Sequence, residues 1–202
     1  MPTGVAIRDA REQLFDAAER ILLRDGPSAL TSRAVTTEAG CAKGVLHRHF
    51  TDFDAFLAEL ILDRIAVVER QSAALCEAAG TSTVTANLTT AVTTLFGGSI
   101  AASIVALITF RDDLRTRLRE TRPTPGIPLL TEATTMLASY LTAERDLGRI
   151  TPGADITTLA PTLIGAAHLL FADRSGAPPE AAAVQRTVTT VLADAVRIPD
   201  RP

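Results

Sequence analysis

The chain has 202 residues, of which 47% are hydrophobic and only 4% aromatic, and its formal net charge at pH 7 is −3. That length and apolar content allow a well-buried core in one domain, or in one domain with a small appendage. The slightly acidic balance excludes nucleic-acid binding through overall charge, so any such function must depend on where individual charges lie.

The first predicted element is an amphipathic helix that ends near residue 25. Its apolar residues recur at steps of three and four from Ile7 to Ile21, which is the period of a helix with one buried face. The Gly26-Pro27 pair follows and predicts the end of this helix.

The next stretch, residues 31–50, predicts two short helices joined by a tight turn. Thr31 can cap the first helix through its hydroxyl, and Gly40 suits the left-handed backbone at the end of that helix. The second helix covers about residues 42–49. Its outward-facing polar residues are Lys43, His47 and Arg48. The pattern predicts a helix-turn-helix whose second helix has a polar, basic outer face.

Seven more helices are expected beyond residue 50, and no stretch has the alternation of a strand, so the predicted class is all-α. Their expected ranges are 51–79, 84–96, 99–110, 111–122, 130–148, one that begins at Asp155 and one that begins at Pro178-Pro179. The helix over 99–110 is apolar nearly all round and is expected to be buried, because its apolar run is too short to span a bilayer.

The last two helices carry apolar and small residues on more than one side. A twofold four-helix bundle between two copies of the chain would cover these sides, and packing within the chain's own core is the alternative. The candidate dimer-interface residues are Leu159, Leu163, Ala167, Val184, Val188 and Val191.

Candidates for a small-molecule pocket are apolar or amphipathic residues on the middle and late helices, although each could instead belong to the core. They are Asn87, Phe96, Phe110, Met136, Tyr140, His168 and Phe171. Asn87 is the only Asn in the chain and could be a buried polar handle. His168 could bond an effector or, as a neutral ring, a backbone carbonyl. Such a pocket would favour a mostly apolar small molecule with one or two polar groups.

The span from about Arg8 to Leu60 resembles the DNA-binding domain of TetR-family transcriptional regulators. The resemblance rests on the helix before Gly26, the segment LTSRAVTTEAG, and AKGVLHRHF with the acidic start of a long helix after it. It implies a three-helix helix-turn-helix DNA-binding domain over residues 1–52. It also implies a helical effector-binding and dimerisation domain over residues 53–202, and a homodimer that binds a palindromic operator in double-stranded DNA.

The expected DNA contacts combine hydroxyls at the start of the first short helix with the exposed residues of the second. They are Thr31, Ser32, Arg33, Lys43, Gly44, Val45, His47, Arg48 and His49. Two positions depart from the family pattern: His47 stands where Tyr is usual, and Phe53 stands where most members carry a Lys that touches the DNA backbone. The loss of one phosphate contact per subunit would reduce the salt dependence of binding by roughly 0.9 per contact.

The resemblance implies a ligand-responsive transcriptional regulator, a repressor released from DNA by its effector. A redox sensor acting through Cys41, beside the second short helix, is an alternative, as is a small helical enzyme. No nucleophile–base pair, phosphate loop or metal-ligand cluster is evident, so no catalytic residue, metal or cofactor is expected. The N-terminus lacks an apolar signal core, and the expected location is cytoplasmic, without a membrane partner.

Overall fold

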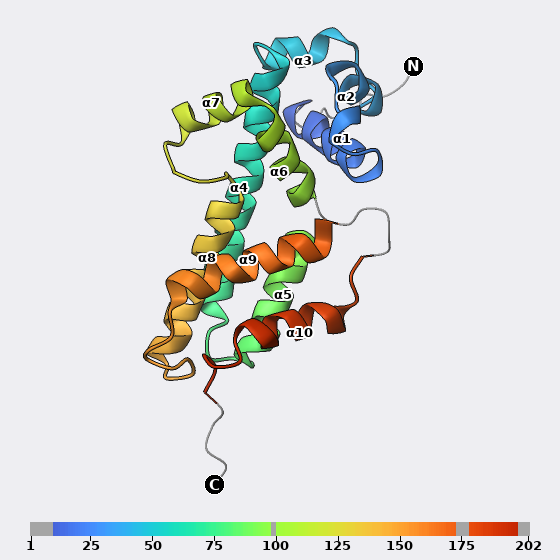
Figure 1. Ribbon diagram of the computed structural model, residues 1–202. Coiled ribbons are helices and arrows are strands. Elements are labelled where there is room, and N and C mark those ends of the chain that lie inside the picture. The colour runs from blue at the N-terminus through green and yellow to red at the C-terminus, as the bar shows by residue number, and fades with distance from the viewer. Residues whose placement is uncertain (1–9, 98–99, 173–177, 198–202) are drawn as a thin grey trace. The chain divides into compact units, whose positions relative to one another are not determined.

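The computed structural model describes residues 10–97, 100–172 and 178–197, and its regular elements there are helices, with one isolated β-bridge between Ile150 and Val196 (Figure 1). The all-α prediction is confirmed. The α-helices are α1 Ala10–Arg24, α2 Ser32–Glu38, α3 Gly44–His49, α4 Phe53–Glu77, α5 Val84–Phe96, α6 Ile100–Phe110, α7 Asp112–Thr121, α8 Leu130–Asp146, α9 Ile156–Ala172 and α10 Ala181–Val191. A single 3-10 turn, η1, covers Pro27–Ala29.

The chain forms two compact units. Unit 1 combines the described residues up to Asp63 with the segment Ser103–Thr124, and unit 2 combines Arg64–Ala102 with the described residues from Pro125 onward. Helix α4 contributes its first part to unit 1 and its last part to unit 2. The expected functional boundary at residue 52 is a separate matter and stays a prediction.

Unit 1 is built on an aromatic cluster that fixes α1, α3 and the start of α4. The ring of Phe50 lies 5.9 Å from that of Phe15 and 5.1 Å from that of Phe56, edge to face in the second pair. Leu46 of α3 and Val35 of α2 are also fully buried. The burial of one residue per turn on such short helices orients them, because isolated helices of six or seven residues are not stable in water.

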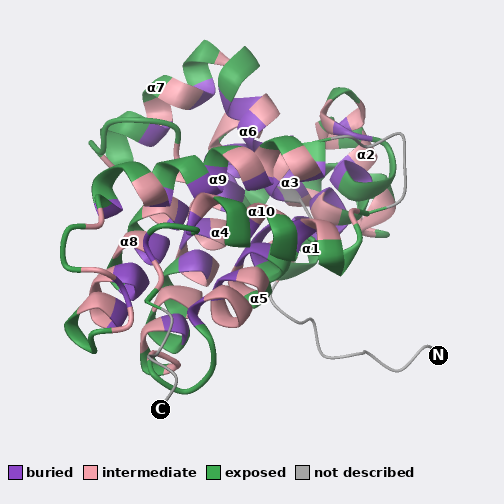
Figure 2. Ribbon diagram, turned by 60° about the horizontal axis from the view of Figure 1, so that its bottom comes forward, coloured by how far each residue is buried: buried purple, intermediate pink, exposed green. Residues whose placement is uncertain are grey.

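Unit 2 packs α5, α8, α9 and α10 around a mostly aliphatic core. Helix α9 lies against α8, α5 and α10, and α10 also packs on α5. Figure 2 shows buried residues alternating with exposed ones along the helices, as expected for amphipathic elements. Asp155 opens α9 as predicted: its Oδ1 accepts a hydrogen bond from the backbone N–H of Thr158 at 3.2 Å.

Helix α6 differs from its prediction at one end. Ile104 and Ile108 are buried, but Phe110, its last residue, is 86% exposed, so the expectation of a helix buried all round is wrong there. Within the described ranges, no single helix is both long and apolar enough to cross a membrane. The pair Val84–Phe96 and Ala101–Phe110 meets that test only jointly, with a bend of 57° between them.

Candidate nucleic-acid interface and effector pocket

The turn between α2 and α3 has the geometry that its residues predict. Thr31 is the N-cap of α2, in an extended conformation, and its Oγ1 accepts a hydrogen bond from the N–H of Ala34 at 3.1 Å. Gly40 has φ 64°, the left-handed region that favours glycine. The N–H of Cys41 then donates to the carbonyl of Thr36 at 3.0 Å and closes the end of α2.

Helix α3 presents a polar face to solvent while one residue anchors it. Leu46 is buried, and Val45 is half-buried. Lys43, at the N-cap position, is exposed, and so are the other outward residues, Gly44, His47, Arg48 and His49. On α2 the side chains of Thr31 and Arg33 are exposed, and Ser32 is half-buried. Unit 1 therefore brings the nine predicted DNA-contact residues together on two adjacent helices.

Neither a close contact nor the backbone conformation of the chain requires glycine at position 44. A Cβ built at this position meets no atom within 4 Å, and its φ is not in the left-handed region. By contrast, Gly40 is required by its positive φ. The open space beside Gly44 lies on the exposed side of α3, where a bound molecule could approach the backbone closely.

An ion-pair cluster holds α2 against α1. Arg20 Nε lies 2.8 Å from Glu38 Oε1, and Arg24 Nη1 lies 3.1 Å from Glu38 Oε2. These hydrogen bonds, with that from Arg20 as the larger cause, hold the pKa of the Glu38 carboxyl below its ordinary value. The cluster lies at the C-terminal end of α2, and its ion pairs join α2 to α1 and use none of the outward-facing side chains of α3.

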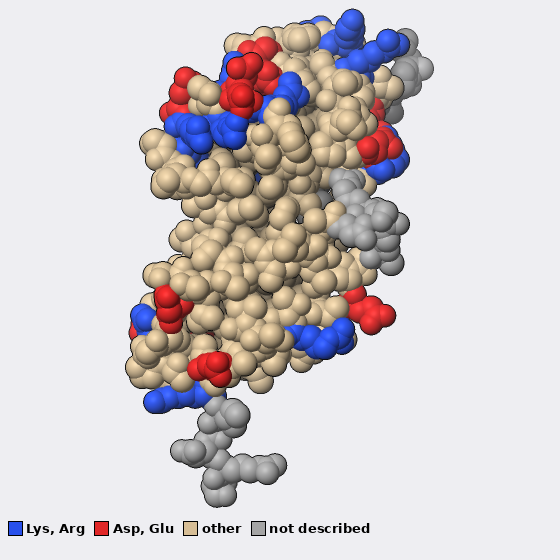
Figure 3. Space-filling model, in the orientation of Figure 1, with Lys and Arg blue, Asp and Glu red and all other residues tan. Residues whose placement is uncertain are grey.

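A second cluster surrounds the start of α4, where Phe53 stands. The ring of Phe53 stacks on Phe56 at 5.6 Å, and the guanidinium of Arg111 lies 5.8 Å from the Phe53 ring centre. Arg111 Nη2 is also 2.7 Å from Asp54 Oδ1. Basic and acidic side chains gather over α7 in Figure 3. The position without the usual Lys therefore still has a cation beside it, although that cation is paired with a carboxylate.

Asp52 connects α7 to the cap of α4. Its Oδ1 accepts from the N–H of Ala55 at 2.7 Å, and its Oδ2 accepts from Arg117 Nη2 at 2.9 Å. The backbone N–H of Ala55, and after it the Arg117 guanidinium, hold the pKa of the Asp52 carboxyl below its ordinary value. The predicted acidic start of this helix is thus an N-cap.

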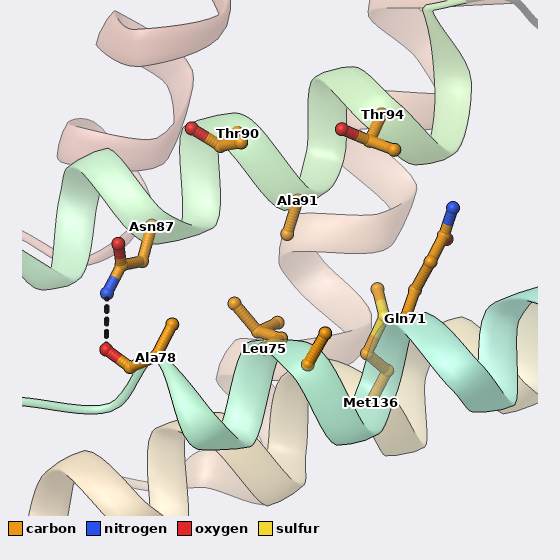
Figure 4. Close-up of a pocket in the computed structure, with 9 residues that line it drawn as sticks. Gln71, Leu75, Ala78, Asn87, Thr90, Ala91, Thr94 and Met136 are labelled. Carbon is orange, nitrogen blue, oxygen red and sulfur yellow. Dashed lines mark hydrogen bonds between the residues drawn. The ribbon is translucent and has the colours of Figure 1, made fainter. Parts of the chain in front are cut away.

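Unit 2 contains a cavity of about 250 Å³ between the end of α4 and α5, with α8 at one side (Figure 4). Its walls carry no charged side chain. The lining residues are Gln71, Ala74, Leu75, Ala78, Asn87, Thr90, Ala91, Thr94 and Met136. Alanines at facing positions of the two helices leave the space, and the polar lining groups are two amides and two hydroxyls.

A buried polar network supports the Asn87 wall of this cavity. Asn87 Nδ2 donates to the carbonyl of Ala78 at 3.1 Å and to Tyr140 Oη at 3.0 Å. Tyr140 donates in turn to Oε1 of Glu144, a carboxylate with no exposed surface. Burial, and then this hydrogen bond, raises the pKa of Tyr140, so the phenol keeps its proton. Arg149 Nε lies 3.3 Å from Glu144 Oε2 and balances its charge.

The predicted ligand residues fall into several places. Asn87 and Met136 line the cavity, and Tyr140 lies behind Asn87. Phe96 contacts the rings of His168 and Phe171 at 6.1 and 5.9 Å in a separate aromatic cluster of unit 2. Nδ1 of His168 is buried without a hydrogen-bond partner among the described residues, so this nitrogen does not make the carbonyl bond that is one of the two alternatives for this residue.

Phe110 belongs to unit 1 and does not line this cavity. Sequence reasoning missed seven of the nine lining residues. The signal that could have found them is a helical stripe of small and hydroxyl residues on α5, namely Asn87, Thr90, Ala91 and Thr94, opposite Ala74 and Ala78.

The predicted interface residues lie mostly inside the chain's own core. Leu163, Ala167, Val184 and Val188 are each at most 2% exposed and pack within unit 2, and the dimer interface stays a prediction. Leu159 and Val191 are half-buried. The exposed side of α9 instead carries Thr162, Gly165 and Leu169, the last 76% exposed.

A metal site and a redox site are two further kinds of site that the side chains could form. Over the described ranges, no group of three or more His, Cys, Asp or Glu side chains is placed to hold a metal ion. Cys41 and Cys76 are both half-buried free thiols, the first in unit 1 and the second in unit 2.

Comparison with known proteins gives a family match for the N-terminal part and a structural similarity over nearly the whole chain. Residues 14–60 match the family model described as bacterial regulatory proteins, tetR family. No curated protein is significantly similar to the full sequence.

Many solved structures share the fold. The reduced form of NemR from E. coli has a TM-score of 0.71 at 15% identity, over 96% of this chain and 100% of that one. A transcriptional regulator from Rhodococcus sp. Rha1 has a TM-score of 0.68 at 24% identity, over 94% and 99%. The regulator FadR from Bacillus subtilis, in complex with stearoyl-CoA, has a TM-score of 0.64 at 18% identity, over 91% and 98%. Residues 14–60 therefore carry the region described by the tetR family of bacterial regulatory proteins, and the chain as a whole shares the fold of these solved structures.

Proposed function

We propose that this protein is a repressor that binds a palindromic operator as a homodimer and is released by a small, mostly apolar effector. The observation that carries the proposal is the exposed polar face of α3, anchored from behind by the buried Leu46. A helix of this kind fits the major groove with its exposed side chains at the base edges.

Each residue of this face has a defined role. Lys43 and Arg48 reach phosphate or guanine, and Val45 offers methyl groups to thymine. His47 and His49 contact the DNA backbone, and Gly44 allows a close approach. At the start of α2, Thr31 and Ser32 bind phosphate through their hydroxyls and Arg33 reads guanine. Arg111, held beside Phe53, is a cation near the place of the family's usual Lys.

The dimer of this proposal uses the exposed sides of α9 and α10. The burial of Leu163 and Val188 in the chain's own core removes them from the contact surface. The exposed Leu169, with Gly165 one turn before it, offers an apolar surface on which the twofold partner can pack. The twofold axis then sets two α3 helices on successive half-sites of a palindrome.

The cavity between α4, α5 and α8 supports the effector part of the proposal. Its walls are mostly apolar and offer no charge that could balance a buried anion. FadR from Bacillus subtilis binds stearoyl-CoA, an anionic ligand, but the uncharged lining here favours a neutral molecule. The effector would act by preferring a state in which the two α3 helices are wrongly spaced for the operator.

The proposal is tested by selection of bound duplexes from a random pool, together with the DNA that flanks the coding region. We expect an inverted repeat whose half-site centres are about one helical turn, or a multiple of it, apart. Bound and free protein are compared by gel shift and by sedimentation. Recovery of no preferred sequence, or binding of a single half-site by a monomer, would contradict the proposed function.

A further inference from the structure

The pocket wall at Asn87 has a fixed hydrogen-bonding direction. Asn87 Nδ2 faces the carbonyl oxygen of Ala78 at 3.1 Å, and a carbonyl can only accept. A flipped amide would set its own oxygen against that carbonyl and lose both hydrogen bonds of Nδ2. The network therefore determines which amide atom is nitrogen.

The buried carboxylate fixes the rest of the chain of hydrogen bonds. Glu144 Oε1 accepts from the Tyr140 hydroxyl and from the N–H of Gly80 at 3.3 Å. The Tyr140 proton is committed to Glu144, so Oη can only accept from Asn87. Both N–H groups of Asn87 are then in use, toward Ala78 and Tyr140.

The atom of Asn87 that remains for a ligand is its carbonyl oxygen. Among the described residues, nothing donates a hydrogen bond to Oδ1, although Asn87 lines the cavity (Figure 4). Thr90, Thr94 and Gln71 can each donate or accept, so they do not select between ligands. Asn87 is therefore the lining residue that selects between ligands, and it favours a ligand that donates a hydrogen bond to its Oδ1.

We propose that the pocket between α4, α5 and α8 binds uncharged effectors through a hydroxyl or N–H group that donates to Asn87 Oδ1. This inference rests on the proposed function and gives its effector a chemical class. An acceptor-only molecule would place its oxygen against Oδ1 and leave both unpaired, which is costly in a mostly apolar site. A carboxylate or phosphate is disfavoured further, because the lining has no cation that could balance its charge.

The chain offers a direct reporter of this pocket. It has two methionines, Met1 and Met136, and Met136 lines the cavity. Protein labelled with ¹³C at the methionine methyls will therefore give two signals, one of them from the pocket. The probes are matched in shape and differ in the donor: indole against benzofuran, and 1-indanol against 1-indanone.

In the full-length wild type we expect indole and 1-indanol to shift the Met136 signal with dissociation constants about tenfold lower than those of their acceptor-only partners. Tyr140→Phe frees one N–H of Asn87, so the wall can also donate, and the preference should fall to less than about threefold. Thr142→Val removes a hydroxyl from the same helix outside the pocket lining and should leave the preference unchanged.

Equal or tighter binding of benzofuran and 1-indanone by the wild type overturns the inference, as does a Met136 signal that no probe moves. If Tyr140→Phe is folded and keeps the full preference, the network does not set the direction and the inference also fails. The proposed function fails separately, in the selection of bound duplexes. A molecule that releases the operator without moving the Met136 signal would preserve the repressor and overturn only this pocket assignment.

Discussion

The two units carry their polar groups in opposite ways. In unit 1 the candidate DNA-binding groups of α3 point to solvent, and the helix is held from behind by the buried Leu46. In unit 2 the decisive polar groups, Asn87, Tyr140 and Glu144, bond to one another behind a cavity. An outward face can be recognised from helical spacing alone, whereas an inward site depends on packing between residues far apart in the chain.

The largest expected effect tests the anchor of the outward face. Leu46→Ala removes a fully buried side chain from the small core of unit 1 and should cost about 2–5 kcal/mol of unfolding free energy. Leu23→Ala in α1, where the side chain is 46% exposed, is the matched control and should cost less than about 1 kcal/mol. Denaturant titration followed by circular dichroism measures both. Equal costs would show that α3 is not held by its core residue.

Two glycines four positions apart, Gly40 and Gly44, allow the effect on folding to be separated from the effect on DNA binding. Gly40→Ala forces a side chain into a left-handed backbone and should cost about 1–2 kcal/mol. Gly44→Ala meets open space and should leave the unfolding free energy within about 0.5 kcal/mol of the wild type, yet weaken DNA binding several-fold. Thermal unfolding and gel shift on the same samples measure the two effects. Full DNA affinity in folded Gly44→Ala protein would contradict the close approach assigned to this residue.

The charge of Asp52 should make a smaller, salt-sensitive contribution. Its folded pKa lies below the ordinary value, so its stabilisation is present above the unfolded pKa of about 4 and is lost as the pH falls through the folded pKa. Asp52→Asn keeps a capping side chain but removes the charge. In denaturant titrations at several pH values, its unfolding free energy should therefore fall less steeply below about pH 4 than that of the wild type. An equally steep fall would show that the ion pair with Arg117 contributes nothing measurable.

The smallest expected effect concerns the redox alternative. The thiol of Cys41 is half-buried, and the backbone N–H of the same residue closes the turn after α2. Cys76 lies in unit 2 and forms no disulfide with Cys41. Peroxide treatment and Cys41→Ser should both leave DNA binding unchanged in gel shift. Loss of binding on oxidation that Cys41→Ser prevents would support a redox sensor instead.

The same contrast explains how much the sequence could predict. Thr31, Gly40 and Asp155 act locally, through caps and a turn, so their structural roles could be predicted from neighbouring residues. The cavity could not, because Ala74 and Ala91 create space only when α4 and α5 face each other.

The dimer candidates show a related limit. Leu163 and Val188 had the correct helical period for a buried face, but periodicity does not say whether the burial is within one chain or between two. The sequence singles out Asn87 as a candidate polar handle, but it does not reveal the hydrogen bonds of Asn87 to Ala78 and Tyr140, since Asn87 and Tyr140 are 53 positions apart.

The most direct test of the central claim is the affinity of Lys43→Ala for the selected duplex. Lys43 is the only lysine in the sequence and is exposed at the start of α3, so its removal should leave the dimer folded. Arg70→Ala, which removes an exposed positive charge from unit 2, is the matched control. We predict that Lys43→Ala weakens operator binding by about tenfold or more, a change of about 1.4 kcal/mol, while Arg70→Ala does not. Equal binding by wild type and folded Lys43→Ala protein would contradict the assignment of α3 as the DNA-reading helix.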